Sequence, residues 1–306
     1  MKTVMNNQKN QRFLKILVVL TILKISAISV IFAQSHEYSA YLGSGLSTLR
    51  YKPSDGNRSG RMGVDFGFGY SYVFHSEWVT GTGNVYRQDW GIHTGIGLGL
   101  YNAMTKLNDV KTVTNLNDGE SRFSDFELHT TLSDYNEKQN TMYLTIPAMG
   151  LFQLDRYYAM GGFKFGIPLN RKYKYQDATL TNIAYYPELE NSITDKKDRG
   201  IGVFEGENFK NKLDVGVVVM FSLEGGVTWE INPDFTLYTG IYFDYGLNNI
   251  VKGDRKGFGN YNPNNREDYT TNSVLSSYTD NRTLTTFTDK VNIMAIGIKV
   301  RLAMQR

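Results

Sequence analysis

The chain has 306 residues with 30 Gly, 21 Tyr, 17 Phe and only six Pro, and its formal net charge is +3. It contains no Cys, which excludes disulfide bonds and thiol chemistry, and the small charge does not indicate nucleic-acid binding. No window after residue 33 supplies about 20 consecutive apolar residues, so a helical membrane protein is excluded.

Residues 1–33 carry five bases and no acid around a long apolar run, and Ala33 precedes Gln34. This pattern is typical of a cleaved secretory signal peptide. An uncleaved membrane anchor is the alternative, but Lys24 lies inside the apolar run and disfavours it. We therefore expect an exported domain at residues 34–306. Without the leader, 28 bases face 30 acids, so the positive balance of the whole chain belongs to targeting.

Residues 61–75 alternate strictly between two kinds of side chain. The odd positions, on one face, are mainly Gly, Ser and Asp. The even positions, on the other face, are Met62, Val64, Phe66, Phe68, Tyr70, Tyr72 and Phe74. A period of two predicts a β-strand with one apolar face. Because the other face is rich in glycine, it suits close packing rather than contact with water. The pattern therefore favours a narrow barrel whose apolar outside meets lipid.

The same alternation recurs along the chain. We expect strands at residues 38–51, 61–75, 89–101, 141–154, 157–170, 213–229, 235–247 and 294–302, which predicts an all-β, eight-stranded antiparallel up-and-down transmembrane barrel. Leu213 and Val215 count among the outward apolar positions of the sixth strand. Pro147 predicts a bulge or a locally unpaired stretch in the fourth.

The connections alternate between short and long. Residues 155–156 and 232–234 form tight turns, whereas 102–140, 172–212 and 251–288 are long and polar. Short turns at one end and long loops at the other are typical of outer-membrane barrels, whose long loops are extracellular. Residues 122–132 alternate as well, so a hairpin there would raise the count to ten strands.

Aromatic residues gather near the short turns on the predicted apolar face. Such rings match an interfacial girdle, in which an amphipathic ring lies between lipid and water. The predicted girdle consists of Phe74, Trp90, Tyr157, Trp229 and Phe235.

Charged residues fall on the inward face. An eight-stranded barrel is just wide enough for its side chains to fill, so inward charges have to neutralise one another. We predict a structural ion network, with a proton path or a binding site as the alternative. Its members are Asp65, Lys164, Glu224, Asp244, Lys299 and Arg301.

Candidate catalytic and metal sites are few. His93 faces inward and could approach Glu224, but an ordinary hydrogen-bonded histidine is the favoured interpretation. A lipid-modifying enzyme would need a catalytic His and Ser on the lipid-facing wall, and the sequence offers none. Residues 115–120 and 254–268 have oxygen donors without the full calcium-loop pattern. We therefore expect neither an enzyme nor a cofactor nor a bound metal.

Two neighbouring segments carry a family resemblance. Residues 142–149 (MYLTIPAM) and 157–169 (YYAMGGFKFGIPL) resemble the outer-membrane β-barrel family of Bacteroidetes, which includes PorT-like proteins, and small barrels of the OmpA and OmpX kind. The matching positions are Tyr143, Leu144, Ile146, Pro147, Gly162, Gly166 and Pro168. The resemblance implies an outer-membrane barrel with no catalytic residues to transfer. The chain departs from it by ending LAMQR, without the usual terminal aromatic.

These observations together predict an integral protein of the Gram-negative outer membrane whose long surface loops serve structural or interaction roles. Its expected partners are membrane lipid, the barrel assembly machinery, and proteins or surface ligands at the loops. An accessory role in protein secretion, as in PorT-like proteins, and a lipid-modifying enzyme are the alternatives. A soluble ligand-carrying barrel would need an apolar lining and a polar outside, which is the reverse of the predicted pattern.

Overall fold

The computed structural model describes residues 33–52, 56–79, 85–117, 125–252, 255–260 and 270–306. The predicted leader therefore lies outside the described residues, apart from Ala33. Within them the chain is all-β, and no helix there is long and apolar enough to cross a membrane. The long strands are β1 (Ala33–Arg50), β2 (Asn57–Val79), β3 (Val85–Leu107), β6 (Tyr135–Leu154), β7 (Tyr157–Tyr186), β10 (Val218–Asn232), β11 (Phe235–Gly246) and β17 (Asn292–Gln305).

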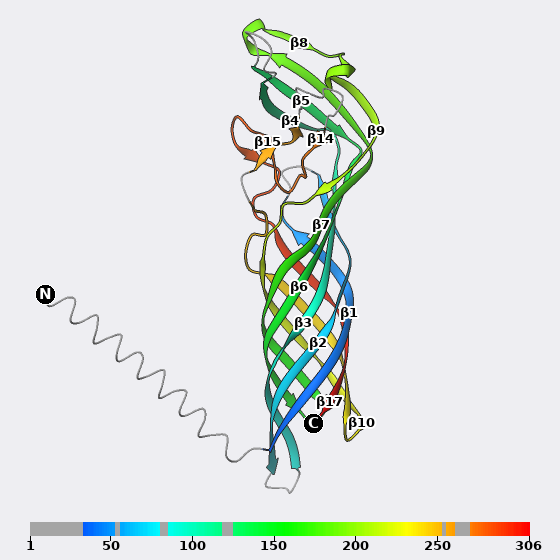
Figure 1. Ribbon diagram of the computed structural model, residues 1–306, viewed down its shortest axis with the longest axis vertical. Helices are drawn as coiled ribbons and strands as arrows, with labels where there is room; N and C mark the ends of the chain where they lie inside the picture. Colours follow the sequence, from blue (N-terminus) through cyan, green and yellow to red (C-terminus); the bar gives the residue numbers. More distant parts are fainter. Residues whose placement is uncertain (1–32, 53–55, 80–84, 118–124, 253–254, 261–269) are drawn as a thin grey trace, which may run out of the picture.

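Shorter elements lie between these strands. They are β4 (Val110–Asn117), β5 (Asp125–Ser133), β8 (Asn191–Ile193), β9 (Gly202–Lys212), β12 (Lys256–Gly257), β13 (Gly259–Asn260), β14 (Thr270–Thr271), β15 (Ser277–Asp280), β16 (Thr285–Thr286) and the 3₁₀ turns η2 (Pro187–Leu189) and η3 (Lys197–Arg199). Most of them rise above the long strands in Figure 1.

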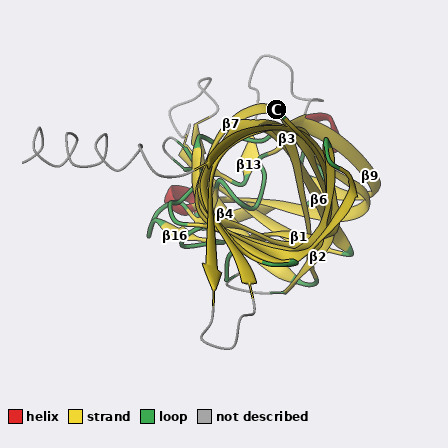
Figure 2. Cartoon of the chain, turned by 90° about the horizontal axis from the view of Figure 1, so that it is seen from below, coloured by secondary structure: helices red, strands yellow, loops and turns green. Residues whose placement is uncertain are grey.

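The eight long strands pair in a closed antiparallel cycle. The order is β10, β11, β17, β1, β2, β3, β6 and β7, and β7 pairs again with β10. The strands accordingly run around a ring when the molecule is seen along its long axis (Figure 2). Since each strand of the cycle has a hydrogen-bonded neighbour on both sides, the cycle leaves no open edge.

The wall is apolar outside and polar inside. Phe66, Val217 and Ile298 expose 43, 51 and 67% of their surface, whereas Asp65 and Lys299 are buried. The outward apolar positions form a band that we call the apolar belt. It extends from Trp90 and Trp229 at one end to Leu169 and Leu247 at the other. A wall with this polarity is stable when its outside meets hydrocarbon, not when it meets water.

The two ends of the cycle differ. At the short-turn end, both ends of the described chain meet, since the N–H groups of His36 and Arg306 bond to each other's carbonyls at 3.1 and 2.9 Å. Asn232 forms one turn there by accepting hydrogen bonds from the N–H groups of Asp234 and Phe235 at 3.0 and 2.9 Å. Asparagine often closes turns through its side chain in this way, which explains the short connection.

At the long-loop end the strands continue beyond the belt. β7 has 30 residues, and its part at 170–186 lies above Leu169. The predicted hairpin is confirmed as β4 and β5, and β5, β8 and β9 all pair with this part of β7. We call β4, β5, β8, β9 and residues 170–186 the upper sheet, which projects at the top of Figure 1.

The prediction for residues 213–217 was wrong in part. β10 begins only at Val218, and Leu213 and Val215 are fully buried rather than outward. Here the chain crosses from β9 to β10, and Val215 forms an isolated bridge with Val251. The two apolar side chains therefore pack into an interior cluster, which their alternation in sequence did not reveal.

The prediction for Pro147 is confirmed on one side of β6. The β3–β6 ladder runs from the pair Thr94–Ala148 to the pair Gly97–Thr145 with no pair between them. Pairing with β7 continues through Pro147, opposite Lys164. A proline lacks the N–H that a second ladder needs, which accounts for the gap.

The described residues between 250 and 291 fold inward over the long-loop end, and we call them the cap. Phe258, Val274, Leu275 and Phe287 from the cap join one buried cluster with Tyr135 and other residues of the barrel wall. The long polar connection predicted at residues 251–288 is thus partly core. Its apolar side chains fill the upper lumen and position the polar groups described below.

Candidate functional site

The structure brings together all six residues of the predicted ion network. Lys164 Nζ lies 3.2 Å from Asp65 Oδ2 and 2.9 Å from Asp244 Oδ2. Lys299 Nζ lies 3.2 Å from the same Asp65 oxygen and 3.3 Å from Glu224 Oε2, and Arg301 also pairs with Glu224. Three acids thus meet three bases in one continuous cluster inside the barrel.

Tyrosine rings complete the surroundings of this cluster. The Lys299 ammonium lies 4.8 Å from the ring centres of both Tyr41 and Tyr242. The Arg301 guanidinium lies 5.0 Å from the ring of Tyr238. Cation–π contacts and mutual neutralisation reduce the cost of keeping these charges away from water. The arrangement fills the lumen at this level.

The predicted girdle residues all lie toward the short-turn end. Trp90, Tyr157 and Trp229 expose 54, 71 and 51% of their surface. Phe74 is paired with Trp90 across the β2–β3 ladder, and Phe235 begins β11. The five rings therefore occupy the outward face near one edge of the apolar belt, where an interfacial girdle is expected.

His93 is buried on the inward face, and its partner is a serine. Its Nδ1 lies 2.9 Å from Ser71 Oγ, which agrees with the favoured interpretation of an ordinary hydrogen-bonded histidine. Serine and histidine face each other because Ser71 and His93 are directly paired across β2 and β3. Both side chains are enclosed in the lumen rather than placed on the outer wall.

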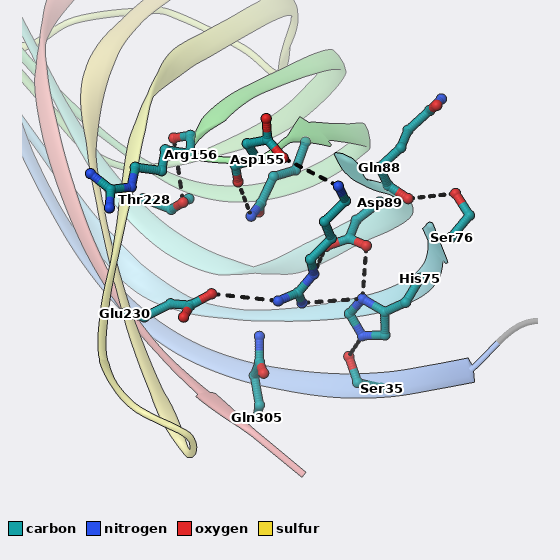
Figure 3. A network of polar contacts seen from close by, with 12 residues as sticks. Ser35, His75, Ser76, Gln88, Asp89, Asp155, Arg156, Thr228, Glu230 and Gln305 are labelled. Carbon is teal, nitrogen blue, oxygen red and sulfur yellow. Dashed lines mark hydrogen bonds and ion pairs between the residues drawn. The ribbon is translucent and has the colours of Figure 1, made fainter. Parts of the chain in front are cut away.

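A second polar network closes the short-turn end (Figure 3). The Ser35 hydroxyl lies 2.7 Å from His75 Nε2, and His75 Nδ1 lies 2.9 Å from Asp89 Oδ1. Arg87 Nε donates to Asp89 Oδ2 at 2.9 Å, and its guanidinium reaches Glu230 at 3.5 Å. Sequence reasoning missed this network, although alternation places Ser35, His75 and Asp89 on the inward face at the same end.

The Ser35, His75 and Asp89 contacts have the connectivity of a catalytic triad. The surroundings of His75 differ from those of a catalytic triad. Arg87 binds the Asp89 carboxylate, and one of its amino groups lies 3.3 Å from the His75 nitrogen that faces Asp89. The Asp89 carboxylate is thus shared between His75 and Arg87. The arrangement therefore fits a polar closure that joins β1, β2, β3 and β10.

Glu137 forms a third polar cluster, above the apolar belt. Its fully buried carboxylate accepts hydrogen bonds from Tyr135 Oη and Gln139 Nε2 at 2.9 Å each, and from two groups of the cap, Ser273 Oγ at 2.5 Å and the Val274 N–H at 3.1 Å. Burial raises the pKa of Glu137 above its ordinary value. This side chain thus fastens the cap to the barrel wall, a role that sequence reasoning missed.

The described residues contain no group of three or more His, Asp or Glu side chains placed to hold a metal ion. Residues 118–120 of the first candidate calcium segment, and residues 254 and 261–268 of the second, lie outside the described residues.

A comparison with protein families adds one finding. The family model of the outer membrane protein beta-barrel domain matches residues 32–252, which is more than half of the chain. A search of curated proteins finds no match. The family match covers all the long strands except β17, and the whole upper sheet.

Proposed function

Because the chain belongs to the outer membrane protein beta-barrel family, we propose that it is a non-enzymatic, eight-stranded transmembrane barrel that presents the upper sheet to partners outside the cell. The short-turn end then faces the periplasm, and the long-loop end is extracellular. The observation that carries the proposal is the length of β7 beyond the belt. Residues 170–186 alone extend about 55 Å at the usual rise per residue.

The filled lumen argues against a channel. The ion cluster occupies the middle of the barrel, and the cap packs apolar side chains above it. Eight-stranded barrels generally have interiors that side chains fill. Conduction would require both layers to move, so transport through the barrel is a poor explanation for this fold.

The upper sheet offers a surface for protein contacts. Leu189, Val203 and Leu284 lie above the belt and expose 51, 43 and 64% of their surface. Strand edges at β8 and β9 also lie in this part of the molecule, and such edges can pair with a further strand. A surface ligand or a protein of the cell envelope is the expected partner.

A non-enzymatic role agrees with the placement of the two serine and histidine groups. Ser71 and His93 are enclosed in the lumen, and Ser35 and His75 lie on the inward face at the periplasmic mouth. Acyl chains of the membrane contact the outer wall instead. A lipid-modifying enzyme would need these groups on that wall.

The proposal includes the expected route to the membrane. The leader at residues 1–33 would direct export, and the barrel assembly machinery would insert the strands. A PorT-like accessory role in protein secretion would use the same upper sheet, through contacts with other envelope proteins. The resemblance of residues 142–149 and 157–169 to Bacteroidetes barrels supports this version of the proposal.

The test combines conductance with site-specific crosslinking. Purified barrel in planar bilayers is expected to show no stable conductance. A photoreactive amino acid at Val203 is expected to crosslink a partner in intact cells, whereas the same group at Ile298, which points into lipid, should give no protein adduct. Stable conductance, or probes above the belt at Leu189, Val203 and Leu284 that all give no adduct, would contradict the proposal.

A further inference from the structure

Five lysines cover the outward face of three neighbouring strands just above the apolar belt. We call them the lysine face: Lys138 on β6, Lys172 and Lys174 on β7, and Lys210 and Lys212 on β9. The ladders place Lys174 directly between Lys138 and Lys210, and Lys172 directly beside Lys212. β7 and β9 run side by side at this height in Figure 1.

This arrangement is unfavourable for the isolated protein. Like charges directly opposite each other destabilise a sheet. In the described part of the chain, none of the five forms an ion pair with an acid, and the nearby Asp214 carboxylate is 3.9 Å from Arg171 instead. The lysine face therefore has an uncompensated positive charge, which an anion from outside the chain would neutralise.

The position of the lysine face relative to the belt identifies the source of that anion. Outward residues of β7 run through Phe165, Ile167 and Leu169 before a register shift opposite Met142 and Tyr143 changes the phase. Lys172 and Lys174 follow Leu169 by about 10 and 17 Å at the rise of a strand. Headgroups of the outer leaflet lie at this height, within reach of flexible lysine side chains.

A groove beside the lysines adds polar and apolar groups. Its volume is about 250 Å³, and its lining includes Asn102, Asn140, Asn170, Lys172, Lys174 and Lys210. Leu100 and Met142 form its lower wall, next to the belt. Ammonium groups suit phosphate, amide groups suit sugar hydroxyls, and the apolar wall suits acyl chains.

We propose that the lysine face and this groove bind the phosphorylated glucosamine headgroup of lipid A, the glycolipid anchor of the outer leaflet. The ammonium groups contact phosphate, the asparagine amides contact the sugar, and the acyl chains lie against the belt below. The site spans the top of the barrel wall and the base of the upper sheet, and it rests on the proposed placement in the outer membrane.

The test measures lipid A binding to the purified full-length barrel in neutral detergent by native mass spectrometry. The triple variant Lys172→Gln, Lys174→Gln and Lys210→Gln removes three charges from the site. The matched control, Lys111→Gln, Lys196→Gln and Lys197→Gln, removes three exposed lysines of the upper region that lie outside the lysine face. Since the triple variant relieves repulsion between paired lysines, it should fold, and heat-dependent gel mobility checks this.

The triple variant is expected to bind lipid A at least about tenfold more weakly, because the loss of each lysine near a charged membrane surface weakens binding several-fold. The control should bind like the native protein. Unchanged affinity in the triple variant would overturn the proposal.

A second experiment compares ligands on the native protein. It distinguishes binding of a lipid from binding of a free anion. Lipid A should bind more tightly than both dephosphorylated lipid A and inorganic phosphate. Equal binding of dephosphorylated lipid A would show that phosphate is not recognised, and equally tight binding of inorganic phosphate would show a soluble-anion site. Either result would overturn the assignment.

Discussion

The ammonium of Lys164 lies 2.9 Å from the carboxylate of Asp244, and both side chains are buried inside the barrel. Ser222 donates a further hydrogen bond to Asp244 at 2.5 Å. On the lumen side, the pair and Ser222 thus link β7 and β11, which lie on either side of β10. Its removal is the first test of the proposed structural role of the ion network.

We expect Lys164→Met to destabilise the barrel by about 3–5 kcal/mol, because it leaves the buried Asp244 carboxylate without its counter-ion. Urea unfolding of the detergent-solubilised barrel, followed by gel mobility and tryptophan fluorescence, measures the change. The double variant Lys164→Met with Asp244→Asn should lose less than the sum of the single changes. The outward Lys174→Met serves as control, and a loss below 1 kcal/mol for Lys164→Met would contradict a structural network.

The second prediction concerns the cap and its dependence on pH. Burial raises the pKa of Glu137, so the folded protein favours the protonated form more than the unfolded chain does. The resulting stabilisation is fully present below the ordinary glutamate value of 4.5 and is lost as the pH rises through the raised pKa. The cap should therefore be less firmly held at neutral than at acid pH.

Amide exchange at Val274 measures this effect, expressed as protection relative to the free peptide at each pH. Protection in the native protein should fall between pH 4 and pH 8, and Glu137→Gln should flatten the curve because it mimics the neutral carboxyl. Glu230→Gln, at the opposite end of the barrel, is the control and should keep the native slope. If Glu137→Gln keeps the native slope, the pH dependence of protection does not come from Glu137.

The third prediction concerns close approach of backbones on the inward face. A side chain at Gly226 would overlap the carbonyl of Thr239 on the neighbouring strand. Gly226→Ala should therefore lower the yield of folded barrel and its stability in urea. Gly150→Ala is the matched control, because its added carbon would meet its nearest atom, the Gly161 carbonyl oxygen, only at 3.8 Å. Similar behaviour of the two variants would show that backbone approach does not limit packing here.

Much of the barrel could be predicted from alternation alone. A strand has only two faces, so Phe66 and Asp65 had to point to opposite sides, and hydrophobicity decided which side met lipid. The inward charges followed from the same parity. In a narrow lumen, few opposite charges lie within reach of any one charged group. Lys164 could therefore be grouped with Asp65 and Asp244 from the sequence.

Other features depended on contacts that alternation does not encode. Glu137 meets Val274, 137 positions later in the chain, because the cap folds back into the lumen. Leu213 and Val215 alternate as strand residues do, but the crossing from β9 to β10 buries both. The register shift near Met142 changes which residues of β7 point outward, and only the ladder shows that Lys172 and Lys212 are neighbours.

The last prediction tests the position of the membrane. Trp90 and Trp229 lie on the outward face near the short-turn edge of the belt, so their indoles should be at the depth of the interface. With Trp78→Phe, these two are the only tryptophans left. Lipids brominated close to the headgroup should quench the emission of the barrel in vesicles more strongly than lipids brominated near the chain ends. Trp90→Phe and Trp229→Phe in the same background assign the signal to each ring. Stronger quenching by the deep bromines would place the girdle inside the hydrocarbon, and no quenching by either lipid would place it in water; both results would contradict the belt defined above.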